Sequence, residues 1–101
     1  MATLPDAAIA EGAARRVEVR GVPLVLLRRR GRLFVLAEQC AHLGGPLSEG
    51  EIDDVSIRCP WHGTRFALDD GAVLEGPATF SQPCFDVRVR DGLIEVRPRP
   101  S

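Results

Sequence analysis

Two short motifs constrain this chain more than any other feature, because they contain both of its histidines. Cys40-Ala41-His42 and Cys59-Pro60-Trp61-His62 are separated by 16 residues and also contain two of the three cysteines. Cysteine sulfur and imidazole nitrogen are ligands that prefer zinc or iron–sulfur iron to magnesium or calcium. The sequence therefore predicts a metal site with four protein ligands: Cys40, His42, Cys59 and His62.

The order of the ligands argues against a common zinc finger, which groups cysteines with cysteines and places its histidines together on a helix. Here each motif supplies one of each, and glycine or proline follows each motif. The pattern resembles the Rieske family, whose second motif is very similar to Cys-Pro-Trp-His-Gly. This resemblance implies one 2Fe-2S cluster per chain, with Cys40 and Cys59 on one iron and His42 and His62 on the other. A structural zinc module stays an alternative, and it would be colourless and free of acid-labile sulfide.

The resemblance also implies the redox chemistry. A cluster with two thiolates and two imidazoles is neutral when oxidised, so it accepts one electron more readily than an all-cysteine cluster does. Its reduction potential lies at about −150 to +300 mV. High-potential members have paired cysteines where this chain has Gly45 and Trp61, and Ser and Tyr hydroxyls where it has Thr64 and Phe66. The expected potential is therefore toward the low end, as in oxygenase ferredoxins. The backbone N–H groups of the Gly44-Gly45 and Gly63 turns are expected to point at the cluster sulfides.

The residues that the chain lacks limit its function. A ring-hydroxylating oxygenase needs a second iron held by two histidines and a carboxylate, whereas both histidines here belong to the motifs. No Gly-x-Gly-x-x-Gly motif for a nicotinamide or flavin cofactor is present. We therefore expect an electron carrier without catalytic residues, which passes electrons from a reductase to a terminal oxygenase or similar redox enzyme. The alternative is a Rieske-like small subunit of a larger oxidoreductase such as nitrite reductase.

Composition and length fit one small carrier domain, residues 1–101. The 13 basic residues, all arginine, balance 14 acidic ones, so we expect no nucleic acid partner. No apolar stretch approaches the roughly 18 residues of a membrane helix, and the N-terminus lacks the pattern of a secretory signal. The expectation is a cytoplasmic protein, without a membrane partner and monomeric when isolated. Cys84 is left over and is interpreted as a small buried apolar residue.

Alternating and β-branched segments predict an all-β fold without long helices. The resemblance implies a Rieske-like antiparallel β sandwich or barrel, built from both ends of the chain, with a small cluster-binding insertion at about 38–76. The first few residues are expected to pair with an edge strand, and the tail 97–101 to be disordered. Expected strands are 17–20, 23–29 and 33–37 in a meander, 55–58, a hairpin of 64–68 and 72–74, and a second hairpin of 85–90 and 93–96.

Some residues near the motifs have simpler interpretations. Trp61 is expected to be a packing residue that covers the cluster rather than an electron relay. Arg65 is the expected contact for the acidic loop, which could also steer a basic partner. Gly76-Pro77-Ala78 resembles the proline-containing third loop that shields Rieske clusters. The acidic loop consists of Glu49, Glu51, Asp53 and Asp54.

Overall fold

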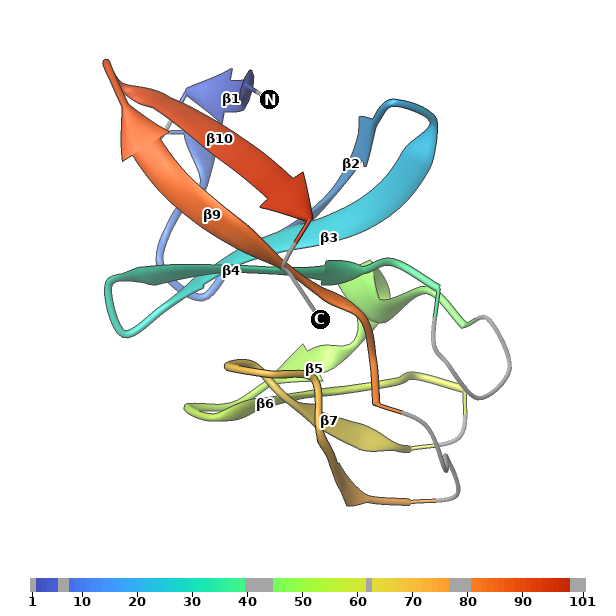
Figure 1. Ribbon diagram of the computed structural model, residues 1–101. Coiled ribbons are helices and arrows are strands. Elements are labelled where there is room, and N and C mark those ends of the chain that lie inside the picture. The colour runs from blue at the N-terminus through green and yellow to red at the C-terminus, as the bar shows by residue number, and fades with distance from the viewer. Residues whose placement is uncertain (1, 6–7, 40–44, 62, 77–80, 99–101) are drawn as a thin grey trace.

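The chain folds into two antiparallel sheets, as a computed structural model describes for residues 2–5, 8–39, 45–61, 63–76 and 81–98 (Figure 1). The first sheet has six strands in the order β1-β10-β9-β4-β3-β2, and the second has four in the order β5-β6-β7-β8. The strands of the first sheet are β1 (Ala2–Pro5), β2 (Ala14–Val19), β3 (Val22–Arg29), β4 (Arg32–Ala37), β9 (Cys84–Arg90) and β10 (Leu93–Pro98). The strands of the second are β5 (Glu51–Ile52), β6 (Ser56–Arg58), β7 (Arg65–Ala67) and β8 (Val73–Glu75).

Strand β3 contains an apolar run that is buried on both faces. Residues 24–27, Leu-Val-Leu-Leu, are at most 1% exposed, which is the pattern of a strand covered on each side. It pairs with β2 on one side and β4 on the other, so the predicted meander is confirmed. The β3–β4 turn places Arg30 and Gly31 at φ 55° and 72°, the two positive values that a tight hairpin turn requires.

The C-terminal hairpin β9–β10 is also confirmed, and it turns at Asp91-Gly92. Strand β1 pairs with β10, as expected for the first residues. The expectation of a disordered tail was wrong for Arg97 and Pro98, which continue β10 opposite Asp86 and Phe85. Cross-strand pairing with β9 holds these two residues in place, and a local composition rich in proline and arginine did not reveal it. Residues 99–101 lie outside the described part.

The second sheet contains the predicted β7–β8 hairpin, and β6 confirms the strand expected at 55–58. Strand β5 and the short 3-10 turn η2 (Leu47–Glu49) were not predicted, because two or three residues are too few to show a period. All four strands fall within the range 38–76. The extent of the domain and of this insertion stays a prediction.

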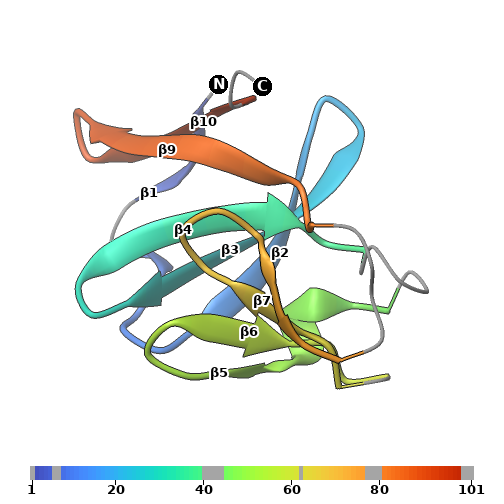
Figure 2. The same ribbon diagram turned by 60° about the horizontal axis from the view of Figure 1, so that its bottom comes forward.

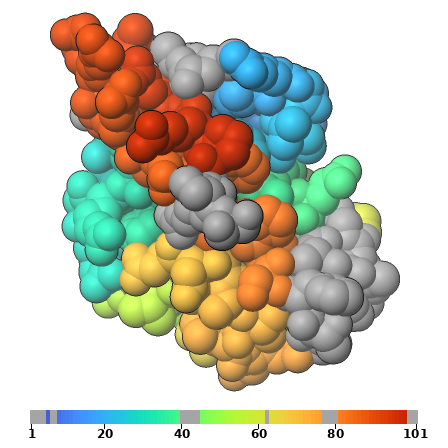
Figure 3. Space-filling model, viewed as in Figure 1, coloured from blue at the N-terminus to red at the C-terminus, as the bar shows by residue number. Residues whose placement is uncertain are grey.

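Strand β4 lies between the β9–β10 hairpin and the second sheet, as both ribbon views show (Figure 2). In the space-filling view, the C-terminal hairpin covers the upper part and the β7–β8 hairpin the lower part of one face (Figure 3). Among the described residues, no helix has the length and apolar character needed to cross a membrane. One buried cluster combines Ile9 with side chains from strands of the first sheet: Leu24, Leu26, Val35, Ile94 and Val96. The other lies between the sheets: Val25, Leu27, Phe34, Leu36, Leu47, Ile57, Cys59, Phe66 and Leu68.

Candidate metal centre

The second motif begins directly after β6, where two backbone hydrogen bonds close a turn. The N–H of Cys59 donates to the carbonyl of Thr64 at 2.8 Å, and the N–H of Gly63 donates to the carbonyl of Cys59 at 3.0 Å. Gly63 has φ 75°, a left-handed conformation that glycine adopts at little cost. The N–H of Gly63 itself is thus used within the turn. The expectation that N–H groups of the Gly44-Gly45 and Gly63 turns point at the cluster sulfides stays a prediction, and Gly44 lies outside the described residues.

Cys59 is 1% exposed and belongs to the apolar cluster between the two sheets. A buried thiol in such surroundings either acts as a small apolar group or, once deprotonated, needs a cation beside it. A metal cluster bound at Cys59 would therefore be attached to the rigid core of the protein. The position of this sulfur is consistent with the predicted ligand role.

Gly45 packs against the second motif from the other side of the site. A Cβ atom at Gly45 would lie 2.9 Å from the Sγ of Cys59 and 3.1 Å from two ring atoms of Trp61. The chain therefore brings the end of the first loop against the second loop with no room for a side chain. Trp61 packs here as predicted, yet it is 59% exposed, so one part of its ring also faces solvent.

Thr64 carries a buried hydroxyl that finds no hydrogen-bond partner among the described residues. The residue is 0% exposed, and within that part of the chain its Oγ1 makes no hydrogen bond. An unsatisfied buried hydroxyl costs about 1 to 3 kcal/mol, so such groups usually serve an absent partner. This hydroxyl is in the residue that closes the Cys59 turn, at one of the two positions where the resemblance places hydroxyls in high-potential members.

Hydrogen bonds at Glu38 hold the two ends of the first loop together. Leu47 donates its N–H to the carbonyl of Glu38 at 2.9 Å. The buried carboxylate of Glu38 accepts from the N–H and hydroxyl of Ser48 at 2.7 and 2.5 Å. Gln39 and Pro46 also form an isolated β-bridge. The loop is therefore closed at its base by groups other than the predicted ligands.

Gln82 connects the base of the first loop to the segment that follows the third loop. Its buried side-chain amide donates to the carbonyls of Ala37 and Gln39, each at 2.7 Å, and its backbone N–H donates to Gly71 at 2.8 Å. Glu38 and Gln82 were not identified from the sequence, since their partners are distant in the chain or are backbone atoms.

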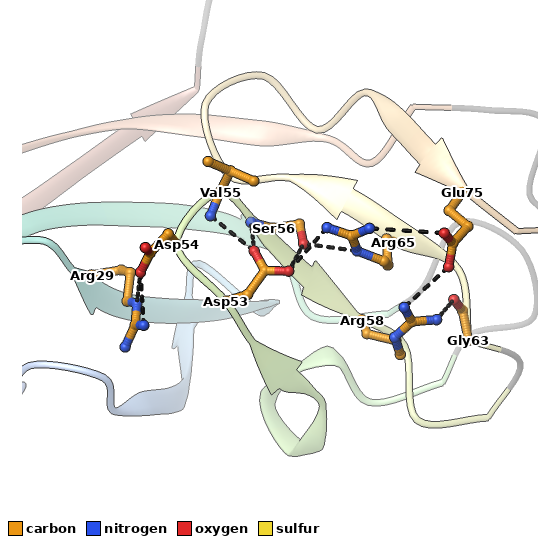
Figure 4. Close-up of polar contacts among 9 residues, drawn as sticks. All are labelled: Arg29, Asp53, Asp54, Val55, Ser56, Arg58, Gly63, Arg65 and Glu75. Carbon is orange, nitrogen blue, oxygen red and sulfur yellow. Dashed lines mark hydrogen bonds and ion pairs between the residues drawn. The ribbon is translucent and has the colours of Figure 1, made fainter.

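A row of charged side chains crosses the second sheet and reaches the second loop (Figure 4). Arg58 donates to the carbonyl of Gly63 at 2.7 Å and to Glu75 at 3.1 Å. Arg65 lies 3.8 Å from Glu75 and donates to Asp53 at 3.0 Å. The predicted contact between Arg65 and the acidic loop is therefore confirmed, whereas the roles of Arg58 and Glu75 were missed.

Asp53 anchors the far end of this row. Burial by itself raises the pKa of Asp53. Three hydrogen bonds, from the N–H of Val55 and from the N–H and hydroxyl of Ser56, favour the ionised form. Together with the Arg65 guanidinium they outweigh burial and lower the pKa of Asp53 to about 2. The carboxylate therefore stays charged at any physiological pH.

Of the four predicted ligands, Cys59 lies in the described part of the chain. Cys40, His42 and His62 lie outside it, so the ligand set stays a prediction. Within the described residues, no three side chains of the metal-binding types gather at one place. Cys84 is half-buried rather than buried, because its sulfur sits at the margin of the core, 3.7 Å from the carbonyl of Gln82.

The residues present fit a 2Fe-2S cluster. Cys59 offers a buried thiol at the turn, and Gly45 lets the backbone of the first loop come close to this sulfur. Thr64 adds a buried hydroxyl that has no partner among the described residues. Soft sulfur donors suit iron–sulfur iron, and outer hydroxyl groups tune such a centre.

Comparison with known proteins identifies the family. The Rieske [2Fe-2S] domain family matches residues 1–86. Ferredoxin CarAc of Metapseudomonas resinovorans is 34% identical over 84% of this chain and 80% of its own length. Apoptosis-inducing factor 3 of Homo sapiens is 31% identical over 85% of this chain, which spans 14% of that protein. A structure described as the complex of reduced oxygenase and oxidized ferredoxin in carbazole 1,9a-dioxygenase contains a chain that superimposes with TM-score 0.91 and 28% identity, covering 100% of this chain and 96% of that one.

Proposed function

Because the chain belongs to the Rieske [2Fe-2S] domain family, we propose that it carries single electrons from a reductase to a terminal oxygenase. The family confirms the cofactor expected from the motifs, a 2Fe-2S cluster, and an electron-transfer function. When bound, the cluster supplies one-electron oxidation and reduction. We propose Cys40, His42, Cys59 and His62 as its four ligands. Cys59 supports this set, because its thiol is buried at the end of β6.

The observation that carries the proposal is the size of the match to ferredoxins. This chain covers 80% of ferredoxin CarAc and 96% of the ferredoxin-sized chain in the carbazole dioxygenase complex. The match to apoptosis-inducing factor 3 covers 14% of that protein. The resemblance therefore concerns the electron-transfer domain. The electron donor, the electron acceptor and the pathway are part of the proposal.

Trp61 provides the chain with a face for protein docking near the cluster site. Its ring packs against Gly45 beside the Cys59 sulfur, and it is 59% exposed. Exposed tryptophan is a common anchor in protein interfaces. A partner that covers Trp61 would thus approach the buried thiolate closely.

The experiment measures metal content and redox stoichiometry of the purified full chain. The proposal expects two iron and two sulfide per chain and uptake of one electron in a reductive titration. Colourless protein with zinc, or a chain without bound metal after iron–sulfur reconstitution, would refute it. The four ligands are tested by Cys40→Ser, His42→Ala, Cys59→Ser and His62→Ala, each of which should abolish the cluster spectrum.

Docking is tested with the oxygenase of a carbazole 1,9a-dioxygenase as acceptor. The reduced chain should be reoxidised when this oxygenase is added without oxygen. Trp61→Ala should slow that step about ten-fold at equal cluster content, in line with an interface anchor worth more than about 1 kcal/mol. The matched control is Leu74→Ala, since Leu74 is 50% exposed and lies on β8.

A further inference from the structure

The second loop is held by a charged side chain outside the predicted ligand set. Arg58, the last residue of β6, donates to the carbonyl of Gly63 at 2.7 Å. The N–H of Gly63 already donates to Cys59 at 3.0 Å. Both backbone polar groups of Gly63 are therefore fixed, and Gly63 directly follows the predicted ligand His62 in the sequence. Arg58 thus restrains the backbone at the point where the chain leaves the motif.

Arg58 lies opposite a second arginine, so its position is favourable only with a negative charge nearby. Arg58 and Arg65 are direct partners across the β6–β7 pair, and like charges in that arrangement repel. Glu75, the partner of Arg65 on β8, lies 3.1 Å from Arg58 and 3.8 Å from Arg65. The Glu75 carboxylate therefore lies between the two guanidinium groups, while Asp53 contacts that of Arg65 from the other side (Figure 4).

Glu75 also connects the second loop to the next one. It is the last residue of β8 and precedes Gly76, whose backbone lies against Thr64. A Cβ atom at Gly76 would approach the Cα of Thr64 to 2.6 Å and its Oγ1 to 3.0 Å. The ion pair with Arg58 thus joins the beginning of the third loop to the end of the second.

We propose that Arg58 and Glu75 act as positioning residues, a two-point clamp that sets the second loop and ties it to the third. The inference rests on the proposed function for its consequence, which is retention of the cluster. Arg58 suits this role because its planar guanidinium offers donors in a fixed fork, so it can bind the Gly63 carbonyl and the carboxylate together. A lysine has a single ammonium group and matches that geometry less well.

The test compares Arg58→Met and Glu75→Gln with a matched control in the full chain. Arg88→Met is the control, because Arg88 also forms a cross-strand ion pair, at 2.6 Å from Glu95, in the first sheet. Loss of cluster absorbance is followed in excess EDTA. Groups behind metal ligands typically contribute 10- to 100-fold to metal affinity or activity, so each clamp variant should lose the cluster about ten-fold faster than wild type. Arg88→Met should stay within about two-fold, as expected for an exposed ion pair.

Two further measurements separate positioning from a general loss of stability. The electron paramagnetic resonance spectrum of the reduced cluster should broaden in Arg58→Met and Glu75→Gln and remain unchanged in Arg88→Met. The double variant Arg58→Met/Glu75→Gln should lose the cluster no faster than about twice the rate of either single variant, because the two residues act as one unit. Arg58→Lys should fall between wild type and Arg58→Met.

Hydrogen exchange over residues 59–65 of the full chain as purified keeps the inference testable whether or not iron is bound. Arg58→Met should speed exchange of this segment about ten-fold relative to Arg88→Met. Equal rates of exchange and of cluster loss in these two variants would overturn the clamp. A wild-type chain that takes up no iron–sulfur cluster would instead refute the proposed function, and the exchange result would still decide on the clamp.

Discussion

Gly45 lies so close to Cys59 that a Cβ atom at Gly45 would come within 2.9 Å of the cysteine sulfur. This contact joins the end of the first loop to the buried thiol of the second. No side chain fits between Gly45 and Cys59, and two atoms of the Trp61 ring lie 3.1 Å from the same Cβ position. A small change at Gly45 should therefore disturb the cluster site directly.

Gly45→Ala should lower the amount of cluster bound per chain by about ten-fold, since outer groups at metal sites have effects of this size. The measurement is the iron and sulfide content after reconstitution. Gly92→Ala is the control. Gly92 has φ 77° and open space around its Cα, so this variant should lose about 1 kcal/mol of stability while keeping a full cluster. Equal cluster content in both variants would contradict the prediction.

Thr64→Val should lower the reduction potential of the cluster, because the buried hydroxyl of Thr64 has no partner among the residues that the structure describes and a donor to cluster sulfur favours the reduced state. Thr64→Ser keeps the hydroxyl and should retain the wild-type potential. Both values are obtained by redox titration. A Thr64→Val protein with an unchanged potential would show that the hydroxyl does not serve the cluster.

Asp53→Asn should reduce the amount of stability that the fold loses as the pH falls. The pKa of Asp53 is lowered to about 2 in the fold, whereas an unfolded aspartate titrates near 3.9. A lowered pKa adds stability that is fully present above about pH 5 and is lost as the pH falls through about 4 to 2. The wild type should therefore melt higher than Asp53→Asn at pH 7, and the gap should narrow between pH 5 and pH 3. A gap independent of pH would contradict this account.

Gln82→Leu should destabilise the fold by about 2 to 6 kcal/mol. Its amide is buried and donates to two carbonyls at 2.7 Å, which lose these bonds at a cost of about 1 to 3 kcal/mol each. Melting temperature measures the effect, and a fall of more than about 8 °C is expected for a chain of this length. Gln39→Leu, at an exposed neighbouring side chain, should change the melting temperature by less than about 2 °C.

The predictable part of the site came from local patterns. Ligand types and their spacing in two short motifs identified the family and its cofactor. Apolar runs and turn residues such as Asp91-Gly92 predicted the strands and hairpins. The expected strand at residues 23–29 came from its leucine and β-branched side chains, although the sequence did not show that β3 would be buried on both faces.

The unpredicted part depends on contacts between residues far apart in the chain. Glu75 meets Arg58 only because β8 pairs with β7 and β7 with β6. Gln82 reaches Ala37 and Gln39 across more than 40 residues, as their separations of 45 and 43 positions record. Arginine, glutamate and glutamine are common surface residues, so nothing in their local sequence distinguishes these three.

The sequence by itself indicated a metal centre with sulfur and imidazole ligands, because these donors are visible in it, and the order of the ligands resembled the Rieske family rather than a zinc finger. It also determined the all-β class, because strand periods are local. The tertiary structure alone decided what supports the centre: the tight approach of Gly45 to Cys59, the unsatisfied Thr64 hydroxyl and the Arg58–Glu75 pair. These features depend on strand register and on close packing between the sheets, which exist only once distant segments have met.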